Sequence, residues 1–245
     1  MIGQTILVVT PVYNSEETLE KAIQSILSQR CSNLILTIVD DCSTDNSLKI
    51  AKQFLSDPRV SIYRSKKNMG AYYSRNFGLY INRNRKWDYF TTHDADDISN
   101  PKRYATLLKY LRGRVNGVQD IFMRRYLESN EAIDEQLTMA HALFTRDVFN
   151  AIGYFDDVRF GADWEHWARL KQYNALTEQT TTNCRIVLGD SYIHDKNLTV
   201  TIPIGSKKRM DYIKKVLRRT SGVSDTDKLY TDFATYPDLT SKVGK

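Results

Sequence analysis

The sequence predicts an α/β domain in which a mostly parallel central sheet is flanked by helices. Apolar runs such as residues 5–10 (TILVVT) are typical of strands that are buried on both faces. These runs alternate with segments whose apolar residues recur at helical spacing, the first of them at residues 15–29. Right-handed crossovers then place the carboxyl ends of the strands along one edge, where ligands bind in open parallel sheets.

The first hundred residues follow this alternation strictly. The first helix opens at Ser15, a favourable N-cap residue, and carries Glu16 and Glu17 in its first turn, where carboxylates are stabilised. In chain order, the predicted elements are strand 5–10, helix 15–29, strand 34–39, helix 45–55, strand 60–63, helix 70–82 and strand 87–92.

Beyond residue 100 the pattern is less regular. Pro101 suits a first helical turn, so a helix is expected from there to about residue 112. Trp164, Trp167 and Leu170 lie at helical spacing and predict a helix over residues 161–173. The remaining predicted elements are strands 117–127, 139–145 and 185–188, followed by a polar tail or the start of a linker at 220–245.

The composition is that of a soluble globular protein, with 41% hydrophobic and 26% charged residues among 245. No apolar run approaches the roughly 20 residues that span a bilayer. Residues 1–4 lack the pattern of a signal peptide. Cys31, Cys42 and Cys184 are an odd number of cysteines without metal-ligand spacing, so we expect free thiols in a reducing cytoplasm.

The net charge of +6 resides in residues 207–219, which hold seven basic residues and one acid. The rest of the chain is therefore neutral, and without a recognised binding motif we expect no nucleic-acid partner. Met210, Ile213, Val216 and Leu217 line one side of the helix predicted here. Such a helix can lie on an anionic membrane or bind an acidic partner. Alternatively, its apolar stripe packs on the domain and its charges are solvated.

Asp94, Asp96 and Asp97 place three carboxylates within four residues, directly behind predicted strand 87–92. Like charges at this spacing repel one another, and burying them without a partner is costly. Mg²⁺ or Mn²⁺ would reverse the effect, because such ions are often held by one or two carboxylates together with substrate phosphates. The alternative is a solvated acidic turn before a helix, with Asp97 or Asn100 as the cap.

Polar side chains at the ends of other predicted strands suit a nucleoside diphosphate. Tyr13 can stack on a base, Asp41 can accept a ring N–H, and Arg75 can reach a phosphate or the base. A metal held by residues 94–96 could bridge the phosphates. Each residue has a structural alternative, which is ordinary packing for Tyr13, a helix-cap role for Asp41 and a surface pair for Arg75.

The order of these motifs resembles glycosyltransferase family 2, whose members have the GT-A fold and are inverting and metal-dependent. The chain departs from the usual pattern at Cys42, where Gly is usual, at Ser74, where Ala is common, and at Ala162, where an acid is usual. The last departure weakens any argument from two neighbouring carboxylates. The resemblance covers roughly residues 4–200 and is carried by segments 8–14 (VVTPVYN), 38–45 (IVDDCSTD), 68–70 with 74–78, 94–97 (DADD) with Pro101, 144–146, 152–156, 161–165 (GADWE) and 192–194 (YIH).

On the donor side, the resemblance implies a nucleotide site and a divalent metal, Mn²⁺ or Mg²⁺. Asp96 would be the principal metal ligand, Asp94 would lie on the metal or the ribose, and His194 would approach from the C-terminal side. Asp97 would be a cap and structural support. The implied nucleotide-binding residues are Thr10, Pro11, Tyr13, Asp41, Arg75, Asp94 and Ala95.

On the acceptor side, the resemblance implies that Asp163 is the general base, which takes the acceptor hydroxyl proton as the oxygen attacks the anomeric carbon. The dipole at the start of a helix also favours a carboxylate there. Two alternatives stay open: Asp163 is only an N-cap, or Glu165 is the base or a second acceptor contact. In addition, Lys207, Lys208 or Arg209 could fold over the diphosphate.

The resemblance thus implies an enzyme that moves a sugar from a nucleotide-sugar donor, with UDP preferred, to a hydroxyl of a glycan or glycolipid acceptor. We expect it in the cytoplasm or at the membrane surface. The alternatives are a sugar-phosphate nucleotidylyltransferase, which needs a Gly-rich basic loop where this chain has PVYNS, and a non-catalytic nucleotide- or carbohydrate-binding domain. The expected organisation is one GT-A domain over 1–220, with a nucleotide-sugar half at 1–100, an acceptor half at 101–205, a basic helix at 207–219 and a tail at 220–245.

Overall fold

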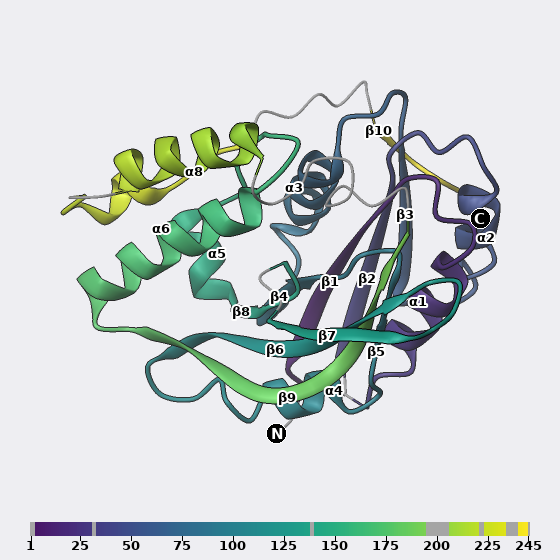
Figure 1. The fold of residues 1–245 in the computed structure, drawn as a ribbon, viewed down its shortest axis with the longest axis horizontal. Coiled ribbons are helices and arrows are strands. Elements are labelled where there is room, and N and C mark those ends of the chain that lie inside the picture. The colour runs from purple at the N-terminus through teal and green to yellow at the C-terminus, as the bar shows by residue number, and fades with distance from the viewer. Residues whose placement is uncertain are drawn as a thin grey trace.

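A ten-stranded sheet forms the centre of the computed structural model, which describes residues 3–30, 33–137, 140–194, 206–220, 223–233 and 240–244 (Figure 1). The strand order is β10-β3-β2-β1-β4-β8-β6-β9-β5, and β7 pairs with β6. The strands are β1 (Thr5–Val12), β2 (Asn33–Asp40), β3 (Val60–Ser65), β4 (Tyr89–Thr92), β5 (Asp97–Ser99), β6 (Val115–Tyr126), β7 (Ala132–Leu137), β8 (Leu143–Thr145), β9 (Thr180–Ile193) and β10 (Thr240–Lys242). The helices are α1 (Leu19–Leu27), α2 (Ser47–Lys52), α3 (Ala71–Asn82), α4 (Arg103–Leu107), α5 (Arg146–Ile152), α6 (Ala162–Thr177), α8 (Lys207–Thr220) and the short 3₁₀ helix η1 (Thr226–Leu229).

The first half is the predicted parallel arrangement. β1 pairs in parallel with β2 on one side and with β4 on the other, and β2 pairs in parallel with β3. Alternate side chains of β1 enter different cores: Leu7 and Val9 join the cluster that contains α3 residues, whereas Ile6 and Val8 join the one that contains α1 residues. Helices therefore cover both faces of the sheet, which confirms the predicted α/β class.

The second half is mixed. β8 runs antiparallel to β4, β6 runs antiparallel to β8, and β9 runs parallel to β6. The predicted strand 185–188 is only a short part of β9, and α4 ends at Leu107 rather than near residue 112. The elements that the sequence did not predict are β5, β7, β10 and α5. Of the predicted strand 139–145, residue 139 lies outside the described residues and β8 occupies the end.

The described C-terminal segments pack back onto the domain. α8 lies along α6, η1 contacts α5 and α6, and β10 extends the sheet antiparallel to β3. Segments 223–233 and 240–244 are therefore packed parts of the fold, although the sequence suggests a tail or linker at 220–245.

Two further observations concern the cysteines and the helices. Cys42 and Cys184 are free thiols, and Cys31 lies outside the described residues. Within the described ranges, no helix combines the length and the apolar character that a membrane span requires.

Candidate active site

A cleft of about 440 Å³ opens at the carboxyl edge of β1, β2 and β4, between these strand ends and the first turns of α3 and α6. Most of the residues singled out from the sequence meet there. Thr10 is the exception, because its side chain is fully buried within β1 and does not line the cleft. The predicted residues in the lining are Pro11, Tyr13, Asp41, Arg75, Asp94, Ala95, Asp96, Asp163 and His194.

The end of β1 presents an aromatic ring to the cleft. Tyr13 is 50% exposed and is therefore not a packing residue of the core. The following residue, Asn14, has a left-handed backbone (φ 49°), and its Oδ1 accepts the N–H of Thr44 at 2.8 Å. This contact fixes the turn after β1 against the turn after β2. A half-exposed ring on a fixed turn is suited to stacking on a planar ligand.

Asp41 holds the entrance of α3 in place. Its two carboxylate oxygens accept the backbone N–H groups of Met69 and Gly70, each at 2.7 Å. Burial raises the pKa of Asp41 even though these two hydrogen bonds favour the charged form. Each oxygen keeps a second lone pair, so contact with a base is compatible with this arrangement. The neighbouring Cys42 has a φ of 67°, a left-handed conformation that explains why a glycine is usual at its position.

Arg75, which is buried, and Asp94, whose side chain is 34% exposed, form an ion pair in the cleft lining. Arg75 Nη2 donates to Asp94 Oδ1 at 2.5 Å, and the guanidinium lies 4.9 Å from the centre of the Tyr72 ring. Burial alone would raise the pKa of Asp94, but Arg75 and His141 outweigh it and hold that pKa below its usual value. Asp94 is therefore charged at neutral pH. Arg75 acts first as its partner, and its guanidinium borders the cleft at the same time.

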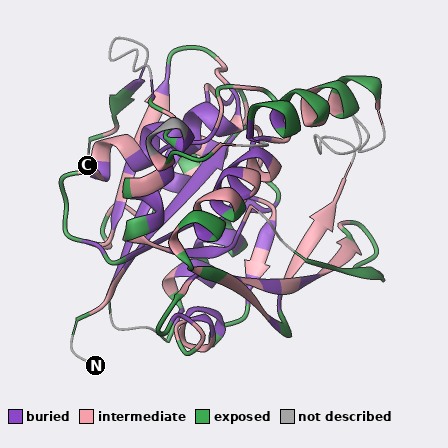
Figure 2. Cartoon of the chain, turned by 90° about the vertical axis from the view of Figure 1, so that its left-hand side faces the viewer, coloured by how far each residue is buried: buried purple, intermediate pink, exposed green. Residues whose placement is uncertain are grey.

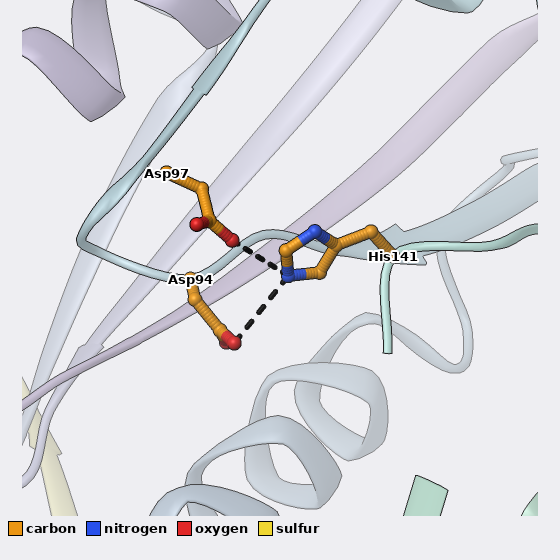
Figure 3. Close-up of side chains that lie close together, drawn as sticks. All are labelled: Asp94, Asp97 and His141. Atoms are coloured by element: carbon orange, nitrogen blue, oxygen red, sulfur yellow. Dashed lines mark ion pairs between the residues drawn. The ribbon is translucent and has the colours of Figure 1, made fainter. Parts of the chain in front are cut away.

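A buried cluster that the sequence did not reveal lies behind Asp94 (Figure 3). His141 Nε2 is 3.1 Å from Asp97 Oδ2 and 3.4 Å from Asp94 Oδ2. Both Asp97 and His141 are almost fully buried, and burial raises the pKa of Asp97. The His141 ring also stacks on His93, with 5.7 Å between the ring centres. Asp97 thus supports Asp94 through His141. The prediction that Asp97 is a helix cap is wrong, because Asp97 lies in β5 and the N-cap of α4 is Lys102.

Two sets of side chains are candidates for a divalent cation, and Asp94 belongs to both. Among the described residues, however, only Asp94, Asp97 and His141 have their ligand atoms close enough together for one ion. The ligand atoms of Asp94, Asp97 and His141 lie within 4.8 Å of one another, but Asp97 and His141 do not line the cleft. Asp94, Asp96 and His194 all line it, and His194 Nε2 lies 3.1 Å from Asp96 Oδ2. The carboxylate oxygens of either set suit Mn²⁺ or Mg²⁺. Only the set that faces the cleft can share its metal with a bound phosphate.

Asp163 lines the cleft from the first turn of α6. Gly161, with a left-handed φ of 77°, is the N-cap of α6, so Asp163 lies inside the first turn and is not the cap. The phenol of Tyr72 donates to Asp163 Oδ1 at 2.6 Å. Burial and the nearby Asp163 carboxylate raise the pKa of Tyr72, so its hydroxyl remains a donor. The sequence did not identify this contact, which joins the start of α3 to the start of α6.

Glu165, the alternative base, points away from the cleft. Its side chain is fully buried and accepts hydrogen bonds from Arg169 at 2.6 and 2.9 Å. Arg219 of α8 donates to the same carboxylate. Glu165 therefore ties α6 to α8 and has no access to a substrate in the cleft.

Two arginines line the cleft on the α6 side. Arg159 Nη1 donates to Asn68 Oδ1 at 2.5 Å, which links the segment before α6 to the segment before α3. Arg209 reaches the cleft from the first turn of α8, with its guanidinium 5.9 Å from the centre of the Phe160 ring. Lys207 and Lys208, named with Arg209 as possible diphosphate contacts, are exposed and do not line the cleft.

The family model and the curated relatives that match this chain are all glycosyltransferases. The family model described as glycosyl transferase family 2 matches residues 7–166. The glycosyltransferase GlyA of Streptococcus pneumoniae serotype 4 is 29% identical over 204 residues, which is 80% of this chain and 28% of GlyA. The putative glycosyltransferase EpsE of Bacillus subtilis is 36% identical over 111 residues, which is 44% of this chain and 39% of EpsE. The chain therefore spans well under half the length of these relatives.

Solved structures share the fold. The mannosyltransferase PcManGT of Pyrobaculum calidifontis, in complex with GDP-Man and Mn²⁺, superimposes with a TM-score of 0.68 at 16% identity, covering 91% of this chain and 67% of that one. Residues 1–349 of S. aureus TarS, in complex with UDP-GlcNAc, superimpose with a TM-score of 0.67 at 14% identity, covering 88% of this chain and 66% of that one. These similarities establish the architecture of a GT-A glycosyltransferase.

Proposed function

Because the chain belongs to glycosyltransferase family 2 and is therefore a transferase, we propose that it moves a sugar, with inversion, from a UDP-sugar to a hydroxyl of a glycan or glycolipid. One observation carries the proposal: Asp163 lines the same cleft as the carboxylates Asp94 and Asp96. An inverting transfer needs a base on one side of the anomeric carbon and a stabilised leaving group on the other.

Asp163 is the general base in this scheme. One carboxylate oxygen accepts the acceptor hydroxyl proton while the acceptor oxygen forms its bond to the anomeric carbon, and the bond from that carbon to the diphosphate breaks. Tyr72 donates a hydrogen bond to Oδ1 of Asp163, which leaves Oδ2 as the oxygen that takes the proton in this scheme. The alternative base, Glu165, is buried and bonded to Arg169 and Arg219, which supports the assignment of Asp163.

Asp94, Asp96 and His194 are the residues that would hold the divalent metal. When bound, the metal supplies positive charge to the departing diphosphate. The chain itself contributes Arg159 and Arg209, whose positions in the cleft lining allow them to bind the diphosphate directly. The structural neighbour PcManGT was solved with Mn²⁺, which supports a metal of this kind.

The nucleotide is placed by the donor side of the cleft. Tyr13 stacks on the base, and Asp41 accepts an N–H from its edge while still holding the turn before α3. Uracil, thymine and guanine all offer such an N–H, and the two solved neighbours carry UDP-GlcNAc and GDP-Man. We propose UDP as the preferred nucleotide. We also place the reaction in the cytoplasm, which the free thiols of Cys42 and Cys184 support.

The two alternative functions are less well supported. A nucleotidylyltransferase would carry a Gly-rich basic loop after β1, where residues 11–15 read PVYNS. A non-catalytic binding domain would not need Asp96 and Asp163 in one cleft.

The proposal is tested by the release of nucleotide diphosphate from UDP-, GDP- and dTDP-sugars, with Mn²⁺, with Mg²⁺ and with a chelator. We expect turnover of a UDP-sugar that the chelator abolishes and added metal restores. Turnover unaffected by chelator would disprove the metal site. Formation of a nucleotide sugar from a nucleoside triphosphate and a sugar phosphate, without transfer, would favour a nucleotidylyltransferase.

A further inference from the structure

The basic helix α8 has two different faces. The inner face packs on the domain: Val216 and Thr220 are buried, and Tyr212 Oη donates to Asp156 Oδ2 at 2.9 Å. Arg219 Nη1 adds a hydrogen bond to Asp156 Oδ1 at 3.1 Å. These contacts, together with the bond from Arg219 to Glu165, fix the helix on α6.

The outer face is both basic and apolar. Met210 and Leu217 are 42% and 47% exposed, and their spacing of seven residues places them two turns apart on one side of the helix. The sequence grouped them with Ile213 and Val216, but the structure turns Val216 inward and leaves Met210 and Leu217 outside. Figure 2 shows that most of α8 is exposed. Lys207, Lys214 and Arg218 are exposed on the same side of the helix, next to this pair, and Lys208 and Lys215 are exposed on its far flank.

These five positive charges lack an acidic partner. None of them forms an ion pair with any residue that the structure describes, and Asp211 is the one acid of the helix. The cationic surface is therefore not neutralised within the described fold. The cations and the two apolar side chains together match a surface that combines negative charge with an apolar layer beneath it.

We propose that the outer face of α8 docks on an anionic lipid bilayer. The cations next to Met210 and Leu217 lie among the anionic headgroups, and these two apolar side chains enter the boundary between headgroups and acyl chains. A nucleic acid would satisfy the charges but leave the apolar side chains in water. The charge complementarity and the apolar pair therefore favour lipid over other polyanions.

Docking also places the cleft relative to the membrane. Arg209, which precedes Met210, lines the cleft from the same helical turn. Arg209 lies on the inner side of this turn, so a bilayer against the outer face of α8 is separated from the cleft by the width of the helix. This consequence rests on the proposed transferase function, and it favours an acceptor that is anchored in the membrane.

Vesicle sedimentation of the full chain, without donor or acceptor, tests the docking. The probes are vesicles of phosphatidylcholine alone and vesicles of equal parts phosphatidylcholine and phosphatidylglycerol. We expect pelleting with the anionic vesicles only, weakened by added NaCl. The variant K207Q/K214Q/R218Q should lower partitioning onto the anionic vesicles by about tenfold or more. The separate variant M210S/L217S should lower the partitioning that remains at high salt.

A matched control removes three exposed lysines on another surface, K49Q/K52Q/K66Q, and should pellet like the unmodified chain. Equal loss in this control, or no pelleting on anionic vesicles, would overturn the docking proposal. Nucleotide diphosphate release is measured in parallel in solution. Pelleting without any donor turnover would contradict the transferase proposal and leave the docking intact.

Discussion

The two sides of the cleft are built differently. On the donor side, Asp41 is bonded through both oxygens to backbone N–H groups, and Asp94 is held by Arg75 and His141. On the acceptor side, Asp163 Oδ1 accepts one side-chain hydrogen bond, from Tyr72. Within the described chain, Asp163 Oδ2 has no hydrogen-bond partner. Asp41 and Asp94 are therefore each held by several partners, whereas Asp163 keeps the free carboxylate oxygen that the proposed base requires.

This difference suits the chemistry of each side. A metal and a diphosphate need ligands that do not move, since reorganisation would weaken the stabilisation of the leaving group. A general base must instead bind an acceptor proton that arrives with the substrate. Tyr72 belongs to α3 and so connects the two sides, because it contacts Arg75 with its ring and Asp163 with its hydroxyl.

Apart from the loss of the base Asp163, the largest effect is expected on the donor side. Asp96→Asn removes a charged ligand from the cleft, so turnover should fall on the order of a hundredfold or more because the diphosphate loses the metal that neutralises it. Titration of activity with Mn²⁺ measures the change, and the half-saturating concentration should rise. An unchanged metal requirement in Asp96→Asn would assign the metal to Asp94, Asp97 and His141 instead.

Substitution of Glu165 tests whether this carboxylate is structural rather than catalytic. Glu165→Gln breaks its ion pairs with Arg169 and Arg219 and leaves buried charge behind, so the free energy of unfolding should fall by about 3 kcal/mol. Urea denaturation measures this. The matched control Glu178→Gln breaks an exposed pair with Arg114 and should change stability little. Loss of turnover in folded Glu165→Gln would return Glu165 to consideration as the base.

His141 tests whether the buried cluster supports the metal site. His141→Asn removes the ring shared by Asp94 and Asp97, and the apparent affinity for Mn²⁺ should fall roughly 10- to 100-fold. The KM for the donor at saturating metal should change less. His166→Asn, a buried histidine whose ring packs on Phe155, is the control. Equal losses in both variants would mean that His141 contributes only to folding.

Tyr72 gives the smallest expected effect. Tyr72→Phe removes the hydrogen bond to Asp163 while keeping the ring beside Arg75, so kcat should fall by about tenfold. Donor affinity should stay the same. Steady-state kinetics separate the two quantities, and a change confined to the donor KM would place Tyr72 on the donor side alone.

The parts of the molecule that the sequence predicted are those defined by local spacing. The strands and helices of the first half recur with clear periodicity, and Asp94 and Asp96 adjoin the strand that positions them. His141 and Tyr72 could not be predicted in the same way, because their partners are brought close only by the tertiary fold. The strands β5, β9 and β10 depend on similarly distant pairing.

Helix orientation was the other unpredictable feature. Asp163 and Glu165 are two residues apart, so they point to nearly opposite sides of α6, and spacing alone does not say which side faces the cleft. The same holds for α8, where Met210, Val216 and Leu217 appear as one stripe but divide between the outer and inner faces. Packing against a neighbouring element decides both cases.

The proposed roles of the two sides of the cleft are tested most directly by Asp163→Asn. Transfer and Mn²⁺-dependent UDP binding should be measured on the same preparation by product analysis and calorimetry, with the exposed neighbour Asp157→Asn as control. We predict that Asp163→Asn lowers transfer about a thousandfold while UDP binding matches that of the unmodified chain. Transfer at the unmodified rate, or a parallel loss of UDP binding, would contradict the account.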